Sequence, residues 1–425
     1  MTARQAALLV PLFIILATIL MVSPSGSIPA AAAASDPGKV PAEILTHFTP
    51  EDIIRGHAYA VGRYWLFAAG TALRLAALAL LIATPASAAL RNVAVRLSPA
   101  RPAVAVAIYI ALLVLIFELL ILPLGYYAGF VREHAFGLST QTRAGWLLDR
   151  TKGALLMLAL AVPLGSLLAL LWRRYPGRWI LPAWFLGGAA MVVLVTLAPV
   201  VIDPIFNVIR PLRDPSIVQR VIALAGKAGI PVDQVYEMDA SRRTVKGNAY
   251  FTGLGRTKRI VLYDTLLKGS SPDEVELVVA HEIGHWKRAH IWKGIGLSLL
   301  GMGIVLWCGA GVLGWAVRQG RFHLVGPADA AGIPVFLLVI LVLSLVGLPI
   351  QNAISRTFER QADRTSLELT GNTTAFIRSE VQLARSNLAD LTPPPLVVWL
   401  LYTHPPVAER IRMAETFATG RQAWP

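Results

Sequence analysis

Residues 104–127 read VAVAIYIALLVLIFELLILPLGYY, and Glu118 is the one charged residue in this stretch of 24. A helix needs about 20 mainly apolar residues to cross the hydrocarbon core of a bilayer. The stretch is therefore long enough to span a membrane. It sets the fold class that we expect for the chain, a mainly α-helical membrane protein.

The rest of the chain has the composition of a protein that crosses the membrane several times. Of its 425 residues, 55% are hydrophobic and 15% charged, whereas soluble domains carry nearer a quarter charged residues. Six further segments are candidate spans, namely 6–22, 64–83, 153–172, 179–201, 291–316 and 333–351. We therefore expect seven transmembrane helices and a multi-pass protein of the cell membrane. The first segment also fits a cleaved signal peptide, because Ala- and Ser-rich residues follow it, but we favour a retained helix.

The charge and the cysteine content limit the partners and sites that we expect. The formal net charge of +14 comes mostly from Arg, and it suits the anionic headgroups of the lipid bilayer as easily as nucleic acid. No basic run with interleaved aromatic residues indicates nucleic acid as a partner. Cys308 is the single cysteine, so neither an intramolecular disulfide nor a cysteine-based zinc site can form. The sequence does not indicate an oligomeric state.

Two polar stretches, residues 211–290 and 355–425, interrupt the apolar pattern. The segments at 291–316 and 333–351 form a hairpin between them, so both stretches emerge on the same side of the membrane. We expect them to pack as one lobe, with a strand at the RIVLY run of residues 259–263. The predicted division is an N-terminal membrane domain of about five helices at 1–210 and a second domain at 211–425.

The first polar stretch contains the sequence HEIGH at residues 281–285, which is an HExxH motif. Residues four apart share one face of a helix, so His281 and His285 can bind one zinc ion through their imidazole nitrogens. Glu282 is placed as the general base that takes a proton from water on that ion. Ser271 is the expected N-cap of this helix.

A catalytic zinc usually has a third protein ligand. His290 lies five residues after His285 and is rotated off the ligand face, and the position of a metzincin histidine is occupied by Ile291. Glu359 is the next candidate. Asp363 lies on the same helix face as Glu359, where it could accept a hydrogen bond from the outer nitrogen of a ligand histidine.

Together these features resemble the type I CAAX prenyl endopeptidases, a family of seven-span zinc metalloproteases. The resemblance covers most of the chain from about residue 59 onward. It includes FVREHAFG at 130–137, DPIFN at 203–207, GNAYF at 247–251, KRIVLYDTL at 258–266 and YTHPPVAER at 402–410. Lys246 departs from the family pattern, which often has histidine or serine before the Asn-Ala-Tyr element.

The resemblance implies roles for four further residues. Asn248 and Ala249 match the edge segment that pairs with the substrate backbone, and His404 and Arg410 match residues near the scissile carbonyl. It also implies seven helices around an intramembrane chamber, capped by a small α+β zinc-metalloprotease lobe of gluzincin type. Arg74 and Glu118, charged residues within apolar segments, fit the lining of such a chamber.

The function that we expect is that of an integral membrane zinc metalloendopeptidase with one Zn²⁺ per chain. Its substrates would be peptides or membrane-associated proteins, cleaved in CAAX-type C-terminal processing or in membrane-protein quality control. A four-span stress protease shares the two motifs, but five apolar segments before HExxH argue against it. A non-catalytic scaffold with a vestigial zinc site is the alternative from another class, although all four motif residues are present.

The side of the membrane that the lobe faces stays open. Loops at the end opposite the lobe hold Arg91, Arg96, Arg101, Arg173, Arg174, Arg178, Arg318 and Arg321, with Asp329 the one acidic residue. The positive-inside rule would make that end cytoplasmic and the lobe external. The resemblance implies a cytosolic lobe instead, and we favour that placement.

Overall fold

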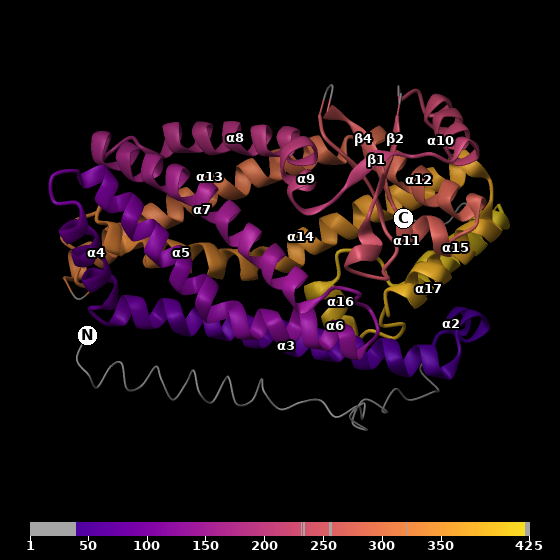
Figure 1. Ribbon diagram of the computed structural model, residues 1–425, viewed down its shortest axis with the longest axis horizontal. Helices are drawn as coiled ribbons and strands as arrows, with labels where there is room; N and C mark the ends of the chain where they lie inside the picture. The colour runs from indigo at the N-terminus through magenta and orange to yellow at the C-terminus, as the bar shows by residue number, and fades with distance from the viewer. Residues whose placement is uncertain (1–39, 231, 233, 255–256, 321, 421–425) are drawn as a thin grey trace.

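The structure is a computed structural model that describes residues 40–420, apart from 231, 233, 255–256 and 321. Long helices run along the long axis of the molecule, and a lobe of short helices and strands lies at one end (Figure 1). The two parts correspond to the apolar segments and the polar stretches of the sequence.

Six helices in the described part of the chain are long and apolar enough to cross a membrane. They are α3 (Pro50–Ala83), α5 (Pro102–Tyr126), α7 (Arg143–Arg174), α8 (Ile180–Leu197), α13 (His290–Gln319) and α14 (Ile333–Thr370). Six of the seven expected segments are thereby confirmed as helices, and the segment at 6–22 lies outside the described residues. α3, α7, α13 and α14 are longer than the predicted apolar segments because their polar ends continue beyond the length that a bilayer core requires. α8 ends at Leu197, earlier than predicted, where a turn of π-helix begins.

Short helices extend or connect these spans. Turns of π-helix at Tyr127–Val131 and Ala198–Ile202 continue α5 into α6 (Arg132–Ala135) and α8 into α9 (Asp203–Phe206). α2 (Ala42–His47) precedes α3 in the sequence, and α4 (Ala86–Leu97) connects α3 to α5.

A four-stranded sheet forms one layer of the lobe. Its strands are β1 (Ile209–Pro211), β2 (Val235–Met238), β3 (Ala249–Thr252) and β4 (Arg259–Tyr263), in the order β1-β2-β4-β3. The strand predicted at 259–263 is β4. It lies inside the sheet, parallel to β2 and antiparallel to β3. β3 is therefore an edge strand, paired on one side only.

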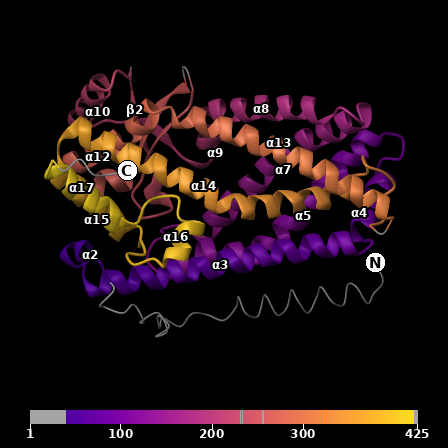
Figure 2. The same ribbon diagram turned by 180° about the vertical axis from the view of Figure 1, so that it is seen from behind.

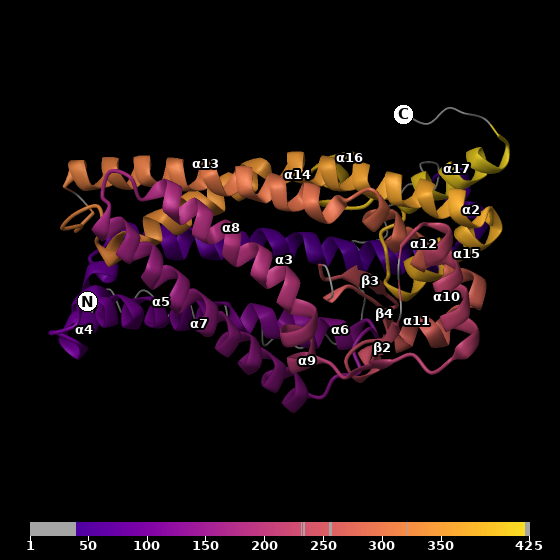
Figure 3. The ribbon, with the colours of Figure 1, turned by 90° about the horizontal axis from the view of Figure 1, so that it is seen from above.

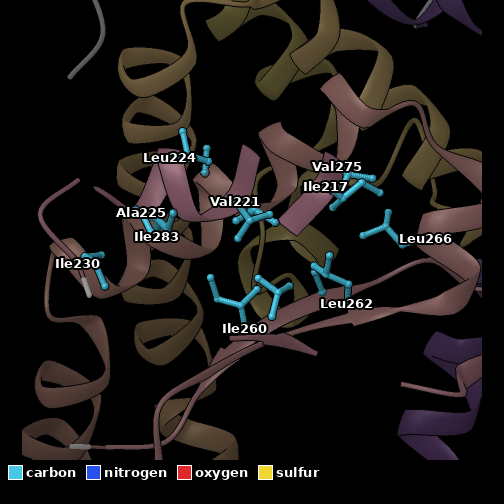
Figure 4. Close-up of a cluster of buried hydrophobic side chains, with 14 residues drawn as sticks. Ile217, Val221, Leu224, Ala225, Ile230, Ile260, Leu262, Leu266, Val275 and Ile283 are labelled. Carbon is cyan, nitrogen blue, oxygen red and sulfur yellow. The ribbon is translucent and has the colours of Figure 1, made fainter. Parts of the chain in front are cut away.

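The lobe contains α15 (Thr373–Ser386), α16 (Pro395–Leu401) and α17 (Val407–Ala418), which pack on α12 (Pro272–Lys287), α14 and one another. The helices that pack with the sheet are α10 (Pro215–Lys227), α11 (Asp264–Gly269) and α12. Figure 4 shows their main core, in which Val221 of α10, Ile260 of β4 and Ile283 of α12 are fully buried. Burying such a side chain contributes about 1.5–3 kcal/mol, so this core holds α12 firmly against the sheet.

The two polar stretches pack together, although the α13–α14 hairpin separates them in sequence. Leu277 of α12 shares a buried cluster with Leu367 of α14, Phe376 of α15 and Met413 of α17. The hydroxyl of Ser366 also donates a hydrogen bond to the Leu277 carbonyl, at 2.9 Å. Figure 2 shows α12, α15 and α17 gathered at the lobe end of α14.

Local sequence explains where the two helices of the site begin and end. The Ser271 hydroxyl accepts a hydrogen bond from the Glu274 amide, and the Glu274 carboxylate accepts one from the Ser271 amide, which confirms the expected N-cap of α12. α14 runs on for 38 residues to Thr370, and Gly371 ends it in the left-handed region with φ 64°. One unbroken helix thus extends from the membrane segment into the lobe.

Candidate metal centre and active site

The site forms where α12 crosses α14 at close range. A Cβ atom on Gly284 would lie 2.8 Å from the Ala362 Cα and 3.0 Å from the Ala362 carbonyl oxygen. Only glycine therefore permits this approach of the two backbones. The approach brings the histidines of α12 against the acidic residues of α14.

Three potential ligand atoms converge at this crossing. The Nε2 atoms of His281 and His285 lie 3.0 Å apart. The carboxylate of Glu359 places one oxygen 3.1 Å from His281 Nε2 and the other 3.5 Å from His285 Nε2. Among the described residues, these three form the one group of His, Cys, Asp or Glu side chains spaced to hold a metal ion.

The surroundings of the three residues favour a positive charge between them. Glu359 Oε2 is buried and accepts no hydrogen bond of good geometry within the structure. Burial alone would lower the pKa of His281, but its contacts with the Asp363 and Glu359 carboxylates outweigh that effect and raise the pKa to about 10. A divalent cation bound by these ligands would supply the positive charge that the two carboxylates attract.

Asp363 lies directly behind His281. Its Oδ1 accepts a hydrogen bond from His281 Nδ1 at 2.7 Å, and the Asp363 side chain is fully buried. The proton on Nδ1 leaves the lone pair of Nε2 free to bind a metal. The two residues are 82 positions apart in the sequence, and the α12–α14 crossing joins them.

Glu282 lies on the same stretch of α12 and is partly buried. Its Oε2 accepts a hydrogen bond from the backbone amide of Phe251 in β3, at 3.2 Å. Burial raises the pKa of the Glu282 carboxyl group, while the neighbouring histidines oppose that shift. A carboxyl group with a raised pKa is suited to accept and release a proton near neutral pH.

Asn248 and Ala249 lie where β3 begins. The Asn248 carbonyl accepts a hydrogen bond from the Tyr263 amide of β4, so the backbone of Asn248 faces into the sheet. Because backbone groups alternate along a strand, Ala249 and Phe251 present theirs at the free edge. The Phe251 amide contacts Glu282 there, which places this edge beside the HExxH helix.

His404 and Arg410 approach the same centre from the C-terminal part of the lobe. His404 follows α16 in a loop, and its Nε2 lies 3.3 Å from Glu359 Oε2 with 58% of its side chain exposed. Arg410 on α17 donates to both oxygens of Asp363, at 2.8 and 2.5 Å, and its Nη1 forms an ion pair with Glu380 Oε2 at 2.5 Å. The guanidinium of Arg410 thus contacts Asp363, behind the ligands, and its predicted role at the scissile carbonyl stays a prediction.

Sequence reasoning missed two residues near the centre. His290 is not in the ligand group, but its Nδ1 lies 2.9 Å from His285 Nδ1. Glu380, on α15, completes the contacts of Arg410. No spacing rule links either residue to HExxH, because one follows a helix break and the other belongs to a different helix.

Models of two protein families together match nearly the whole described chain. The model described as Peptidase family M48 matches residues 211–418. The model described as the CAAX prenyl protease N-terminal region with five membrane helices matches residues 32–208.

Individual proteins show the same relationship. The chain is 35% identical to the uncharacterized metalloprotease YhfN of Bacillus subtilis over 317 residues, which cover 72% of each protein. It is 32% identical to CAAX prenyl protease 1 of Saccharomyces cerevisiae over 323 residues, or 71% of this chain and 70% of that protein. The crystal structure of S. mikatae Ste24p superposes with a TM-score of 0.80 at 26% identity, covering 95% of this chain and 96% of the other.

Proposed function

Because the chain belongs to peptidase family M48 and is an integral membrane metalloendopeptidase, we propose that its metal is zinc, bound by His281, His285 and Glu359. Two imidazoles and one carboxylate are a common ligand set of catalytic zinc. Ligand distances of roughly 2.0–2.1 Å and tetrahedral angles separate the ligand atoms by about 3.3 Å. The observed separations of 3.0, 3.1 and 3.5 Å are close to that value.

Glu282 is the proposed general base and acid of the reaction. When bound, zinc lowers the pKa of a water molecule to about 7 and polarises a carbonyl group. Glu282 takes one proton from the attacking water and delivers it to the nitrogen of the scissile bond as the C–N bond breaks. Its raised pKa supports this role, because the same group must gain and then lose the proton.

The free edge of β3 is the proposed binding surface for the substrate backbone. Ala249 and Phe251 direct their carbonyl groups to this edge, where an extended peptide could donate hydrogen bonds to them as an added strand, while the Phe251 amide already donates to Glu282. Asn248 would hold the beginning of the strand, since its side chain accepts a hydrogen bond from the Ala249 amide at 2.9 Å. A peptide bound there would run past Glu282.

His404 is the proposed donor to the oxygen that becomes negative during the attack. Its ring is exposed and lies 3.3 Å from Glu359, so it can reach a carbonyl group bound at the same ligands. We retain Arg410 as a contributor of positive charge. Its contacts with Asp363 and Glu380 favour an action through Asp363 and His281.

The proposed substrates are peptides and membrane-associated proteins that enter in an extended form. Two roles are compatible with this site, namely CAAX-type C-terminal processing and membrane-protein quality control. The name of the yeast relative supports the first role, while the bacterial relative carries no substrate in its name. The non-catalytic scaffold is disfavoured, because the chain belongs to a peptidase family and retains all four motif residues, namely His281, Glu282, His285 and Glu359.

We also propose that the spans enclose a chamber beneath the site, with a seventh helix supplied by residues 6–22. Glu118 of α5 accepts a hydrogen bond from Arg150 of α7 at 2.6 Å. A charged pair between two spans is more stable facing a watery interior than facing lipid, which supports a polar chamber.

The mechanism predicts that Glu282→Gln abolishes cleavage but retains zinc. The amide cannot accept the proton of water, and the loss of a general base typically lowers the rate by roughly a hundredfold to ten-thousandfold. Zinc content by mass spectrometry and cleavage of a quenched fluorescent peptide are measured on the purified full chain. Glu276→Gln, on the same helix but paired at the surface with Arg220, is the matched control, and undiminished cleavage by Glu282→Gln would exclude the mechanism.

A further inference from the structure

We propose that His290 and Gln361 are positioning residues, which place the proton of His285 on Nδ1 and so leave the lone pair of Nε2 for the metal. The inference rests on the proposed zinc site. It adds a second pair of residues that determines which nitrogen of a ligand histidine carries the proton. Asp363 performs this task for His281, whereas among the described residues the partner of His285 Nδ1 is His290 and not a carboxylate.

A chain of three side chains leads away from the metal. His285 Nδ1 lies 2.9 Å from His290 Nδ1, and His290 Nε2 lies 3.0 Å from Gln361 Oε1. The Nε2 of His285 points the other way, toward His281 and Glu359. The two nitrogens of His285 thus have separate roles. Nε2 faces the proposed metal position, and Nδ1 faces the chain of hydrogen bonds.

The direction of these hydrogen bonds follows from the amide oxygen of Gln361. An amide oxygen can only accept, so the Nε2 of His290 carries the proton between them. A neutral imidazole has one proton, and the Nδ1 of His290 must therefore accept. The proton between the two Nδ1 atoms belongs to His285, whose Nε2 is left with a lone pair.

The opposite arrangement would be incompatible with a metal ligand. If the amide nitrogen of Gln361 faced His290, the proton of His290 would move to Nδ1 and point at His285. His285 would then carry its own proton on Nε2, directed at His281 Nε2 3.0 Å away. The orientation of one amide group on α14 thereby determines whether His285 can bind the ion.

Packing holds the His290 ring in place for this role. The residue is 5% exposed, and its ring stacks on Phe358 with centroids 4.2 Å apart and an interplanar angle of 7°. Ala289, in the left-handed region with φ 56°, ends the turn after α12, so that α13 begins at His290. This break brings His290 beside His285, which a continuous helix would not do.

The test is the zinc affinity of the purified full chain, measured by competition with a fluorescent chelator. His290→Leu removes the acceptor, and we expect zinc to bind roughly ten- to a hundredfold more weakly, as is typical when a partner of a ligand histidine is lost. His290→Asn restores an acceptor, because its amide oxygen can occupy the place of Nδ1, and it should recover most of the affinity. Gln361→Glu can only accept, so it should bind zinc at least as tightly as the native chain.

A control separates this role from packing. Phe358→Leu removes the stacked ring but leaves the hydrogen bonds, so it should lower the melting temperature of the metal-free protein while zinc affinity stays within about threefold. Equal zinc affinity of His290→Leu and the native chain would overturn the inference, as would equal losses in His290→Leu and His290→Asn. Absence of stoichiometric zinc from the native chain would instead contradict the proposed function.

Discussion

Arg410 connects the metal centre to a second buried carboxyl group. Its guanidinium lies between Asp363 and Glu380, both of which are almost completely buried. Burial alone would lower the pKa of Arg410, but the two carboxyl groups raise it above its ordinary value. One positive charge faces two acidic groups, and Asp363 also accepts a hydrogen bond from His281, so Asp363 retains the negative charge most easily. Burial then raises the pKa of Glu380 to about 7.

This raised pKa predicts a stability difference between the native chain and Glu380→Gln that depends on pH. The ordinary pKa of Glu380 is 4.5 and the folded value about 7. Between these values the folded state keeps a proton that the unfolded state has released, so the native chain loses stability as pH rises. Glu380→Gln does not lose stability in this way, because the amide has no proton to release in this pH range. We expect it to gain up to about 3 kcal/mol relative to the native chain between pH 5 and pH 8.

Melting temperatures in detergent between pH 5 and pH 8 measure this difference. The relevant quantity is how the difference in melting temperature between the two proteins changes with pH, because Glu380→Gln also alters the ion pair with Arg410. Parallel curves over the whole range would show that Glu380 is ionised in the folded protein and that the raised pKa is wrong.

At the scale of elements, the α12–α14 crossing determines the site. Gly284 occupies the second x of HExxH, a position at which the motif allows any residue. The structure explains why this residue is glycine, because the Ala362 backbone occupies the space that a side chain at position 284 would need. The crossing also carries the contact between His281 and Asp363, so the distance between the two helices controls the metal ligands.

Gly284→Ala is therefore expected to destabilise the protein and weaken zinc binding. In an open helix the change from glycine to alanine gains up to about 1 kcal/mol, whereas overpacking a core typically costs about 1–3 kcal/mol. The backbone of α14 cannot move aside as a flexible side chain could, so the overpacking term should dominate. Zinc affinity and melting temperature measure the outcome.

Gly301→Ala on α13 is the matched control. A Cβ there would meet no atom within 4 Å, so this variant should retain stability and zinc affinity. A Gly284→Ala protein as stable as Gly301→Ala would show that the two helices can separate without cost.

At the scale of the whole molecule, the site and the basic loops lie at opposite ends. Figure 3 shows α13 and α14 running side by side from the lobe to the far end, where α4 lies. Asp329 at that end forms an ion pair with Arg91, and further Arg residues flank it. The hairpin places both halves of the lobe on one side of the membrane.

Cysteine labelling tests this arrangement. In a Cys308→Ser background, Lys227→Cys and Thr419→Cys place thiols on the two halves of the lobe, and Arg178→Cys places one at the far end; all three positions are exposed. A maleimide that cannot cross membranes should label the first two from the same side and the third from the other. Labelling of Lys227→Cys and Thr419→Cys from opposite sides would contradict the hairpin, and the labelled side shows which way the lobe faces.

Several features of the chain could be predicted from its sequence because each depends on neighbouring residues. Apolar runs identified six described spans, the RIVLY run identified β4, and Ser271 identified the beginning of α12. The i, i+4 spacing of His281 and His285 indicated a metal site for the same reason, since a helix fixes the positions of such residues by itself.

The tertiary structure alone decided which distant residues meet. The sequence predicted that Asp363 contacts a ligand histidine, and the fold decided that this histidine is His281. The position of the β3 edge beside Glu282, the approach of His290 to His285 and the place of Glu380 behind Arg410 also arise from packing between separate elements. Local hydrogen bonds and hydrophobic periodicity determine helices and strands, but how they pack depends on side-chain shape along the whole chain. The sequence by itself therefore determined the motif and the spans, while the fold decided how protons and charges are arranged around the metal.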